Sequence, residues 1–344
     1  MAVIAKTKRN WEKTFSIWSK PPGKAKQEQC ERAKKAIKDA IESDTTLSTK
    51  SIRTCVQGSY QNRTNVRQNS DVDVCILYKD VFFCHLPEGI NPQWVGITPM
   101  NYDFKNYKNN VKRALVNKFG HNNVNRGNKA FNIHESTRRV DADAVPCFKY
   151  RWYYFSNWVP AKTLKRFYGP GYLPRVPRDY KMGLIPKPEF LWVPNWGRLQ
   201  YHEGTALVAD NTEHLAINFP TQQYNNGIEK NEATGGRFKK AVRIIKKLSY
   251  EMKDNKCTSA KNISSFLIES LVWNVDNRCF DSQSLHLMTK NVLAYLRSCT
   301  KEDATCESWV EENGIKFLFH PTQKWRRTQA HQFSRDAWVY IANR

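Results

Sequence analysis

The residues best suited to chemistry lie in the segment 58–73, which reads GSYQNRTNVRQNSDVD. Gly58 lets the backbone approach a phosphate closely, and Ser59 offers both an N–H and a hydroxyl to phosphate oxygens. Asp71 and Asp73 are two residues apart on a predicted strand, so both carboxylates project from the same face. Two adjacent carboxylates repel each other unless a cation lies between them, and hard oxygen ligands suit Mg²⁺ with a triphosphate. The segment therefore predicts a site for Mg²⁺ and a nucleotide.

A third carboxylate is expected from the predicted strand 139–148. Asp141 and Asp143 point the same way from this strand, and Asp143 is preferred because the apolar run AVPCF follows it directly. Three carboxylates can hold two Mg²⁺ ions about 3.5–4 Å apart, with Mn²⁺ as a substitute, which serves nucleotidyl transfer. A lone Asp-x-Asp is common on solvent-facing strands, so the catalytic interpretation depends on the Gly-Ser turn before it.

The elements predicted around these residues form a mixed α/β lobe. Segments 51–56, 72–78 and 139–148 alternate apolar with polar residues and are rich in β-branched side chains, which is typical of strands. A break at Pro21-Pro22-Gly23 precedes an amphipathic helix over 24–44, which we expect to brace the fold. Its apolar face contains residues at helical spacing, namely Cys30, Ala33, Ile37, Ala40 and Ile41.

The second half of the chain differs from the first in composition. Seven of the fifteen prolines lie within 160–196, which excludes a helix or a central strand there, while the aromatic residues of the segment argue against a flexible linker. We therefore predict an ordered, basic excursion over 160–197. Beyond Gly235-Gly236, apolar faces predict helices within 238–248, 263–275 and 333–341. The expected domains are 1–227, containing the bracing helix and the excursion, and 228–344, a helical lobe.

The composition limits the class of protein. The chain has 344 residues with 40% hydrophobic residues, which excludes general disorder. It has no apolar run of 18 residues and no secretory signal, so we expect a cytoplasmic protein without a membrane span, and a monomer. Its nine cysteines include no C-x-x-C pair, which predicts reduced thiols and makes a zinc site unexpected.

The charge is the unusual quantity, because 55 Lys and Arg against 32 Asp and Glu give a net charge of +23. A field of this size favours polyanions. We expect structured RNA to bind as an activator or, in the simpler interpretation, a basic surface without a partner. The candidate polyanion-binding residues are Arg175, Arg178, Lys181, Lys240, Lys247, Lys324, Arg326 and Arg327.

Five blocks taken together resemble a known family, the cGAS/DncV-like nucleotidyltransferases (CD-NTases) of bacteria, within the polymerase-β-like nucleotidyltransferase superfamily. The blocks occur in order between about residues 50 and 280, and they read GSYQNRTNVRQNSDVDVCI, VDADAVPCFKYR, INFPTQQYNNGIEKN, GRFKKAVRIIKKL and ISSFLIESLVWNV. They are most similar to the CdnE branch, which acts in CBASS anti-phage defence. The resemblance implies an α+β fold, with a polymerase-β-like core, a C-terminal helical lobe, and the active site in the cleft between them.

The resemblance also implies an activity and residue roles. The expected activity is the synthesis of a cyclic dinucleotide messenger from NTPs, containing UMP and AMP or GMP and AMP, and this messenger would reach a downstream effector. Asp71, Asp73 and Asp143 match the metal ligands. The predicted nucleotide-binding residues are Gly58, Ser59 and Lys246 on the donor triphosphate, Ser265 on a phosphate, Phe266 on a base, and Asn218 in the acceptor base pocket.

Several alternatives stay open at this point. A helical wheel places Lys239 beside Lys246, with Lys240 and Lys247 pointing away, and Phe266 could equally belong to the core. The activity could instead be transfer of nucleotides to RNA ends or to a protein, or the chain could be a nucleic-acid sensor. No histidine has an acid–base context, and His85, His134 and His214 are interpreted as structural or surface residues.

Overall fold

The structure is a computed structural model, and it describes residues 9–66, 72–87, 89–100, 103–134, 140–155, 182–184, 191–193, 197–211, 215–321 and 323–342. The chain forms two compact units. The helical unit comprises residues 1–22, 62–66 and 222–344, and the sheet unit comprises residues 23–61 and 67–221. The division after residue 221 lies close to the predicted one after 227. The N-terminal segment, however, belongs to the helical unit and not to the predicted N-terminal lobe.

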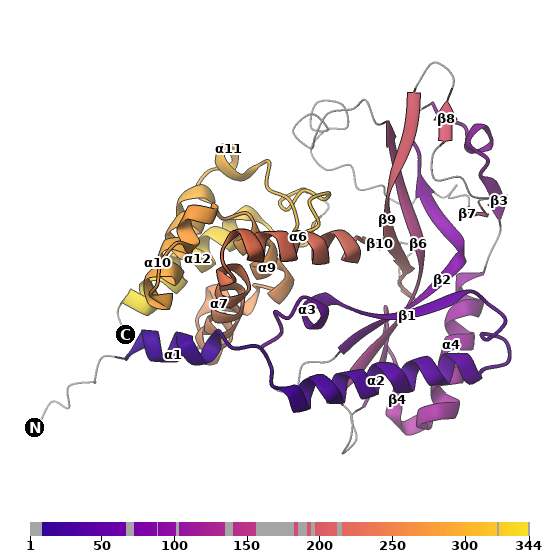
Figure 1. Cartoon of the computed structure of the whole chain (residues 1–344), viewed down its shortest axis with the longest axis horizontal. Helices are drawn as coiled ribbons and strands as arrows, with labels where there is room; N and C mark the ends of the chain where they lie inside the picture. The colour runs from indigo at the N-terminus through magenta and orange to yellow at the C-terminus, as the bar shows by residue number, and fades with distance from the viewer. Residues whose placement is uncertain are drawn as a thin grey trace, which may run out of the picture. The chain divides into compact units, whose positions relative to one another are not determined.

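The sheet unit is built on one mixed sheet, in which β2, β6 and β9 are the long central strands (Figure 1). Its strands are β1 (Ile52–Gln57), β2 (Val72–His85), β3 (Thr98–Met100), β4 (Val124–Arg126), β5 (Phe131–Ile133), β6 (Ala142–Phe155), β7 (Met182–Leu184), β8 (Leu191–Val193), β9 (Gly197–Val208) and β10 (Leu215–Asn218). Its helices are α2 (Lys24–Ser43), α3 (Gly58–Gln61) and α4 (Phe104–Phe119), with 3₁₀ turns η1 (Pro92–Val95) and η2 (His121–Asn123).

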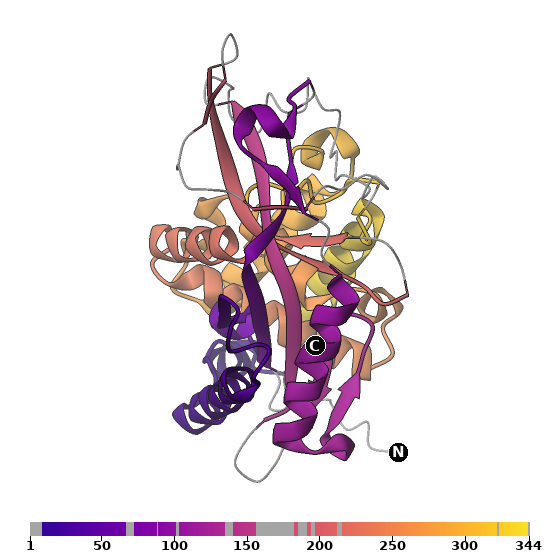
Figure 2. The same cartoon turned by 90° about the vertical axis from the view of Figure 1, so that its right-hand side faces the viewer.

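The central strands divide their side chains between two faces. The strands β2 and β6 are parallel, whereas β1 on β2 and β9 on β6 are antiparallel. Val72, Val74, Ile76 and Tyr78 are buried on the face that α2 and α4 cover (Figure 2). Tyr107 of α4 donates its hydroxyl to the Ile76 carbonyl at 2.9 Å. The odd-numbered residues of β2, including Asp73, therefore lie on the opposite face.

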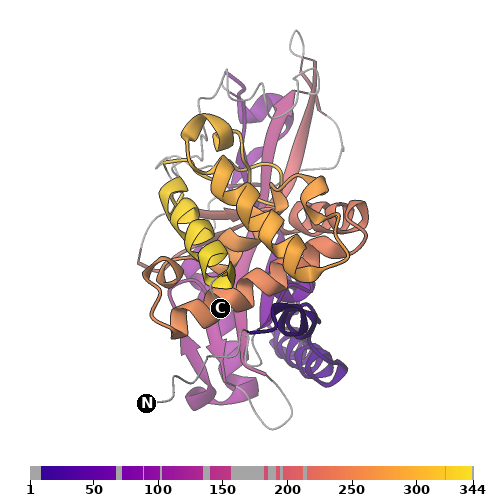
Figure 3. The same ribbon diagram turned by 90° about the vertical axis from the view of Figure 1, so that its left-hand side faces the viewer.

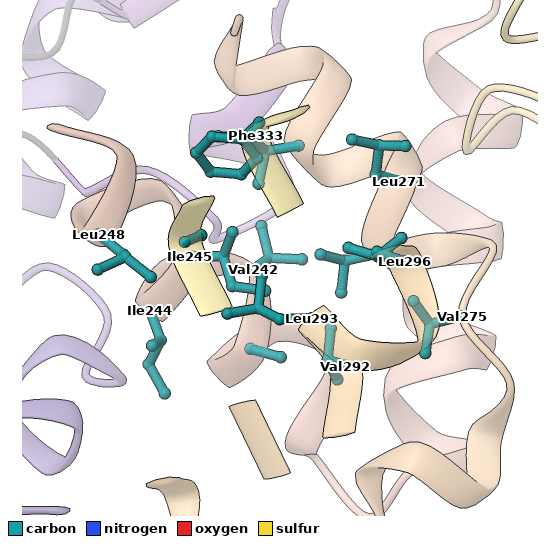
Figure 4. Close-up of a cluster of buried hydrophobic side chains, with 14 of the residues drawn as sticks. Val242, Ile244, Ile245, Leu248, Leu271, Val275, Val292, Leu293, Leu296 and Phe333 are labelled. Carbon is teal, nitrogen blue, oxygen red and sulfur yellow. The ribbon is translucent and has the colours of Figure 1, made fainter. Parts of the chain in front are cut away.

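The helical unit contains α1 (Trp11–Trp18), α6 (Pro220–Ala233), α7 (Arg237–Asp254), α8 (Thr258–Lys261), α9 (Ser265–Trp273), η3 (Asn277–Phe280), α10 (Leu285–Cys299), α11 (Asp303–Cys306) and α12 (Arg327–Ala342). Helix α12 packs along α10 (Figure 3). Apolar side chains of α7, α9, α10 and α12 meet in one core (Figure 4), with Val242, Ile245, Leu271, Leu293 and Phe333 among its members.

Helix α1 explains why the N-terminal segment belongs to the helical unit. Asn10 caps it by accepting from the Lys13 N–H at 3.0 Å, and Trp11 and Phe15 are buried in the helical core. The guanidinium of Arg9 lies 4.4 Å from the centroid of the Trp11 ring. Helix α2, the predicted brace, packs on α4 and the sheet within the sheet unit.

The structure extends the predicted elements. The predicted strands 51–56, 72–78 and 139–148 correspond to β1, β2 and β6, and β2 and β6 are longer than predicted. The predicted C-terminal helices correspond to α7, α9 and α12. Within the excursion the described residues form only β7 and β8, each of three residues, and the rest of 160–196 lies outside the described residues.

Candidate active site

Two of the three predicted carboxylates lie side by side on the central sheet. Asp73 of β2 and Asp143 of β6 are partners in the parallel register, and neighbouring strands lie about 4.8 Å apart. On its other side Asp143 pairs with Asn132 of β5, whose Nδ2 donates to Asp143 Oδ1 at 2.5 Å. The sheet thus directs both carboxylates to one face and orients that of Asp143. Asp71 lies outside the described residues.

The register also distinguishes Asp143 from Asp141. Asp141 precedes β6, and its carbonyl accepts the Val72 N–H at 3.0 Å. Burial raises the pKa of Asp143 and the nearby Asp141 raises it further, although the hydrogen bond from Asn132 acts in the other direction. A cation beside Asp73 and Asp143 would offset the cost of ionising the buried Asp143 carboxyl, so the arrangement favours Asp143 as the second ligand.

Gly58 is in contact with this site. Its φ is +71°, and a Cβ added at this position would lie 2.6 Å from Asp73 Oδ2. No side chain other than hydrogen can therefore occupy the position without displacing the carboxylate. The glycine follows β1, whose last residue, Gln57, is the antiparallel partner of Asp73. Ser59 is the next residue and is half-buried at the start of the four-residue α3.

These residues fit a hard divalent cation. Asp73 and Asp143 supply carboxylate oxygens, the donors that Mg²⁺ prefers, and the missing Cβ of Gly58 leaves room for the Asp73 carboxylate. Among the described residues no group of three His, Cys, Asp or Glu side chains suits a metal ion, and the third predicted ligand, Asp71, is not one of those residues.

Lys246 is not placed as predicted. The sequence predicts an ammonium at the edge of a helix, free to contact a triphosphate, but the side chain of Lys246 on α7 is only 1% exposed. Its Nζ lies 2.6 Å from Glu269 Oε2 of α9, which is equally buried. The charge of Lys246 and the hydrogen bonds that Glu269 accepts outweigh burial, which acts to raise its pKa, and they hold the pKa of Glu269 below its usual value. The ammonium is thus engaged inside the fold.

A second buried carboxyl, Glu312, lies in the same unit. The residue is 0% exposed, and Gln223 Nε2 donates to its Oε2 at 3.2 Å, while its Oε1 has no hydrogen-bond partner. Burial raises the pKa of Glu312 well above its usual value, and Glu269 raises it further. Burial and the neighbouring Glu269 therefore both favour the protonated form of the Glu312 carboxyl.

We expect Glu312→Gln to stabilise the protein at neutral pH. In the unfolded chain Glu312 ionises near pH 4.5, whereas the folded chain keeps the proton, so native stability falls as pH rises through and beyond this value. An amide removes that loss, with a gain of about 1–3 kcal/mol, typical of a buried polar group without a partner. Thermal unfolding from pH 4 to pH 8 checks this, with exposed Glu302→Gln as control. A lower melting temperature for Glu312→Gln at pH 7 would show an ionised Glu312.

Ser265 and Phe266 begin helix α9. Ser264 is its N-cap, and Ser265 Oγ lies 2.7 Å from the Tyr250 hydroxyl. Phe266 is half-buried and stacks on Trp325, with ring centroids 5.4 Å apart and planes inclined by 28°. Phe266 is thus not among the buried residues of the core, which was one of the two interpretations. Trp325 is an aromatic neighbour that sequence reasoning missed, and no local spacing links it to Phe266.

The remaining candidates differ in exposure. Asn218 ends β10 and is exposed, as are Lys240, Lys324 and Arg326. Lys247 is half-buried, and burial together with Arg243 lowers its pKa. Arg175, Arg178 and Lys181 lie outside the described residues.

The prediction that Arg327 binds a polyanion is not supported by its contacts. Its guanidinium forms an ion pair with Asp303 and donates to the carbonyls of Thr300 and Lys301 at 2.6 and 2.7 Å. These carbonyls directly follow the C-terminal end of α10, where a cation is favourable. Arg327 therefore caps the C-terminal end of α10. This role could not be predicted, because Arg327 and the end of α10 are far apart in the sequence.

His85, His134 and the cysteines have surroundings that fit the structural or surface roles predicted for them. His85 packs edge-on against Trp152, and burial lowers its pKa. His134 Nε2 lies 2.8 Å from Asn125 Nδ2, and His214 lies outside the described residues. All nine cysteines are free thiols. Among the described helices, none is both long and apolar enough to cross a bilayer.

Comparisons with known proteins extend these findings. The family defined as the cGAS/DncV-like nucleotidyltransferase C-terminal helical domain matches residues 225–342. The cyclic dipyrimidine nucleotide synthase CdnE of Legionella pneumophila is 34% identical over 334 residues, which cover 96% of this chain and 98% of the relative. The synthase of the same name from Cecembia lonarensis is 34% identical over 332 residues, with the same shares of 96% and 98%.

Among solved structures, that of the Elizabethkingia meningoseptica CdnE cyclic dinucleotide synthase with GTP and Apcpp is similar. It gives a TM-score of 0.71 at 27% identity and covers 96% of this chain and 98% of that chain. The similarity extends over both units and confirms the predicted fold class, a mixed-sheet core with a C-terminal helical lobe.

Proposed function

Because the chain belongs to the cGAS/DncV-like nucleotidyltransferases, we propose that it joins two nucleoside triphosphates into a cyclic dinucleotide that serves in anti-phage defence. The prediction of an enzyme that transfers nucleotides is confirmed by these relatives. The observation in the structure that carries the proposal is the pairing of Asp73 with Asp143, with Gly58 against the first of them.

We infer that Asp73 and Asp143, together with Asp71, hold Mg²⁺. The ions would lower the pKa of the attacking hydroxyl and neutralise the leaving pyrophosphate. A ribose hydroxyl of one nucleotide attacks the α-phosphorus of the other, the bond to the β-phosphate oxygen breaks, and pyrophosphate leaves. A second transfer within the linear product closes the ring. The protein contributes position and charge, and no histidine is required.

The base composition of the product is inferred from the relatives. The sequence alone suggests UMP with AMP or GMP with AMP, but both relatives at 34% identity are named cyclic dipyrimidine nucleotide synthases. We therefore propose that the product contains at least one pyrimidine nucleotide. Exposed Asn218 at the end of β10 is our candidate for base recognition, since an amide presents both a donor and an acceptor to a base edge.

Product analysis tests the proposed function. The protein is incubated with Mg²⁺ and four NTPs, one of which is labelled on the α-phosphate in each reaction, and products are treated with phosphatase. We expect a phosphatase-resistant dinucleotide that is labelled from UTP or CTP. A product that forms only after addition of an RNA or protein acceptor would identify a terminal transferase. A product labelled from purines alone would contradict the pyrimidine assignment.

We also propose that structured RNA activates the enzyme by contacting exposed lysines such as Lys240 and Lys324. The net charge of +23 exceeds what one triphosphate needs. Affinity that depends on phosphate contacts falls steeply with salt, and each lost contact reduces the slope of log K against log[salt] by about 0.9. Changing both lysines to Glu should therefore reduce that slope by about 2 and remove activation. The matched control is the pair Lys105→Glu and Lys118→Glu on α4, both exposed. Full activity without RNA would contradict the proposal.

A further inference from the structure

Lys246 and Glu269 hold one short segment of chain from two sides. Lys246 Nζ donates to the Thr64 carbonyl and hydroxyl, both at 3.3 Å. Glu269 accepts the Thr64 hydroxyl at 2.9 and 3.0 Å and Asn62 Nδ2 at 3.0 Å. The three donors of the ammonium and both oxygens of the carboxylate are thereby engaged. Thr64 is 0% exposed and Asn62 is 4% exposed, so water does not compete for these bonds.

The segment is held at a third point, next to the other two. Arg63, between Asn62 and Thr64, has a φ of 57°, which non-glycine residues seldom adopt. Arg243, one turn before Lys246 on α7, donates from Nη1 to the Arg63 carbonyl at 2.6 Å and from Nε to the Ser19 carbonyl at 2.6 Å. A backbone in this sparsely populated region persists only where its surroundings fix it.

The position of this segment in the chain gives these contacts a consequence for catalysis. Residues 62–65 follow Gly58 and Ser59 by three residues, and they precede Asp71 and Asp73 by only a few more. The chain leaves the sheet unit at residue 62 and returns to it after residue 66. Whatever restrains residues 62–65 therefore restrains the connection between the two motifs that we assign to the nucleotide and the metal.

Stability alone does not account for a buried ion pair. Removing two charges from water costs nearly as much as their attraction returns, and apolar residues of similar size are often equally stabilising. Removing one partner is costly, however, because the other charge is left buried and unpaired. Such a pair is thus better explained by the conformation that its hydrogen bonds specify, here that of Asn62, Arg63 and Thr64.

We propose that Lys246 and Glu269 are positioning residues, which fix the 62–65 segment and through it the Gly58-Ser59 turn, and that Lys246 does not contact the triphosphate. The inference rests on the proposed function, since it assumes that the turn binds a nucleotide. It makes Glu269 as important as Lys246, whereas a direct contact between Lys246 and phosphate would make the neighbouring carboxylate unfavourable for binding.

A double-mutant cycle separates these roles. Lys246→Met and Glu269→Met are compared with the double variant, at a temperature well below every melting temperature, through kcat, KM and affinity for non-hydrolysable NTP analogues. We expect each single change to lower kcat/KM by about 10- to 100-fold, as small displacements of catalytic groups do. The double variant should stay about as impaired as either single variant, because it leaves no buried unpaired charge but makes none of the bonds to Asn62 and Thr64.

Thr64 gives a milder second test, should a single methionine variant fail to fold. Thr64→Val removes the hydroxyl that bridges the pair but leaves Lys246 and Glu269 facing each other. We expect it to lower kcat/KM by about 3- to 10-fold, since the hydroxyl's bonds to Glu269 and Lys246 are lost, while Thr64→Ser keeps the wild-type value. A role in folding alone would move the melting temperatures and leave kcat/KM of the folded protein unchanged.

Other results would overturn the inference. Wild-type or tighter analogue binding by Glu269→Met, with weaker binding by Lys246→Met, would show that Lys246 contacts the triphosphate directly. If Lys246→Met is impaired while Thr64→Val keeps wild-type kcat/KM, Lys246 acts on the triphosphate directly and not through Thr64. Failure of the proposed function is recognised separately, because the wild-type protein would then bind the analogues without making a cyclic product. In that case the double-mutant cycle is evaluated from the affinity for the analogues.

Discussion

Asp73→Asn should abolish cyclic dinucleotide synthesis while the protein remains folded. The change removes one negative ligand from the pair formed with Asp143 on the neighbouring strand. Loss of the cation's contribution to charge neutralisation, about 4 kcal/mol or more, corresponds to at least about 10³-fold in rate. The measurement is the initial rate of pyrophosphate release with Mg²⁺ and NTPs.

The control for this substitution lies on the same strand. Asp80 of β2 is exposed, and its Oδ2 accepts the Ser51 N–H at 3.1 Å, which the amide oxygen of Asn can also do. Asp80→Asn should therefore keep wild-type activity. The melting temperature of Asp73→Asn without metal should equal or exceed that of wild type, because repulsion between the two carboxylates is relieved. Activity of Asp73→Asn within about tenfold of wild type would contradict the metal assignment.

The carboxylate site could be predicted because its signals are local. Asp-x-Asp on a strand fixes a common face, and a preceding Gly-Ser marks a turn, so neither depends on distant residues. The adjacency of Asp73 and Asp143 was only an expectation, since the parallel register of β2 and β6 is a property of the sheet. The contact between Gly58 and Asp73 Oδ2 could not be foreseen for the same reason.

The surroundings that could not be predicted are those of side chains whose partners are distant in sequence. The periodicity of α7 places Lys246 at the edge of the apolar face, but Glu269 and Thr64 bury it there. Arg327 lies in a basic stretch, yet the end of α10 engages it. Helix α1 was missed because its apolar residues, Trp11 and Phe15, occupy only two turns. Propensity over so short a segment is weak compared with the packing that stabilises it.

Gly58→Ala is expected to impair catalysis nearly as severely as the loss of a carboxylate. Two effects combine at this residue. An L-residue at a φ of +71° costs about 1–2 kcal/mol, and the new Cβ would lie 2.6 Å from Asp73 Oδ2. Either the backbone turn or the carboxylate must move, and a displacement of about 1 Å in a catalytic group can cost 10²-fold. We therefore expect kcat/KM to fall by about 10²-fold or more.

Two other glycines separate the effects that combine at Gly58. Gly236 has a φ of +78° with nothing within 4 Å of its added Cβ, so Gly236→Ala imposes the backbone cost without touching a carboxylate. Gly23, with a φ of −67° and equally open surroundings, carries neither cost. We expect Gly236→Ala to lower the melting temperature less than Gly58→Ala does, since it carries the backbone cost alone, and Gly23→Ala to lower it least. Both should retain near-wild-type kcat/KM below their melting temperatures. If Gly58→Ala also retained it, the close approach to Asp73 would have no catalytic role, and the turn would serve only the fold.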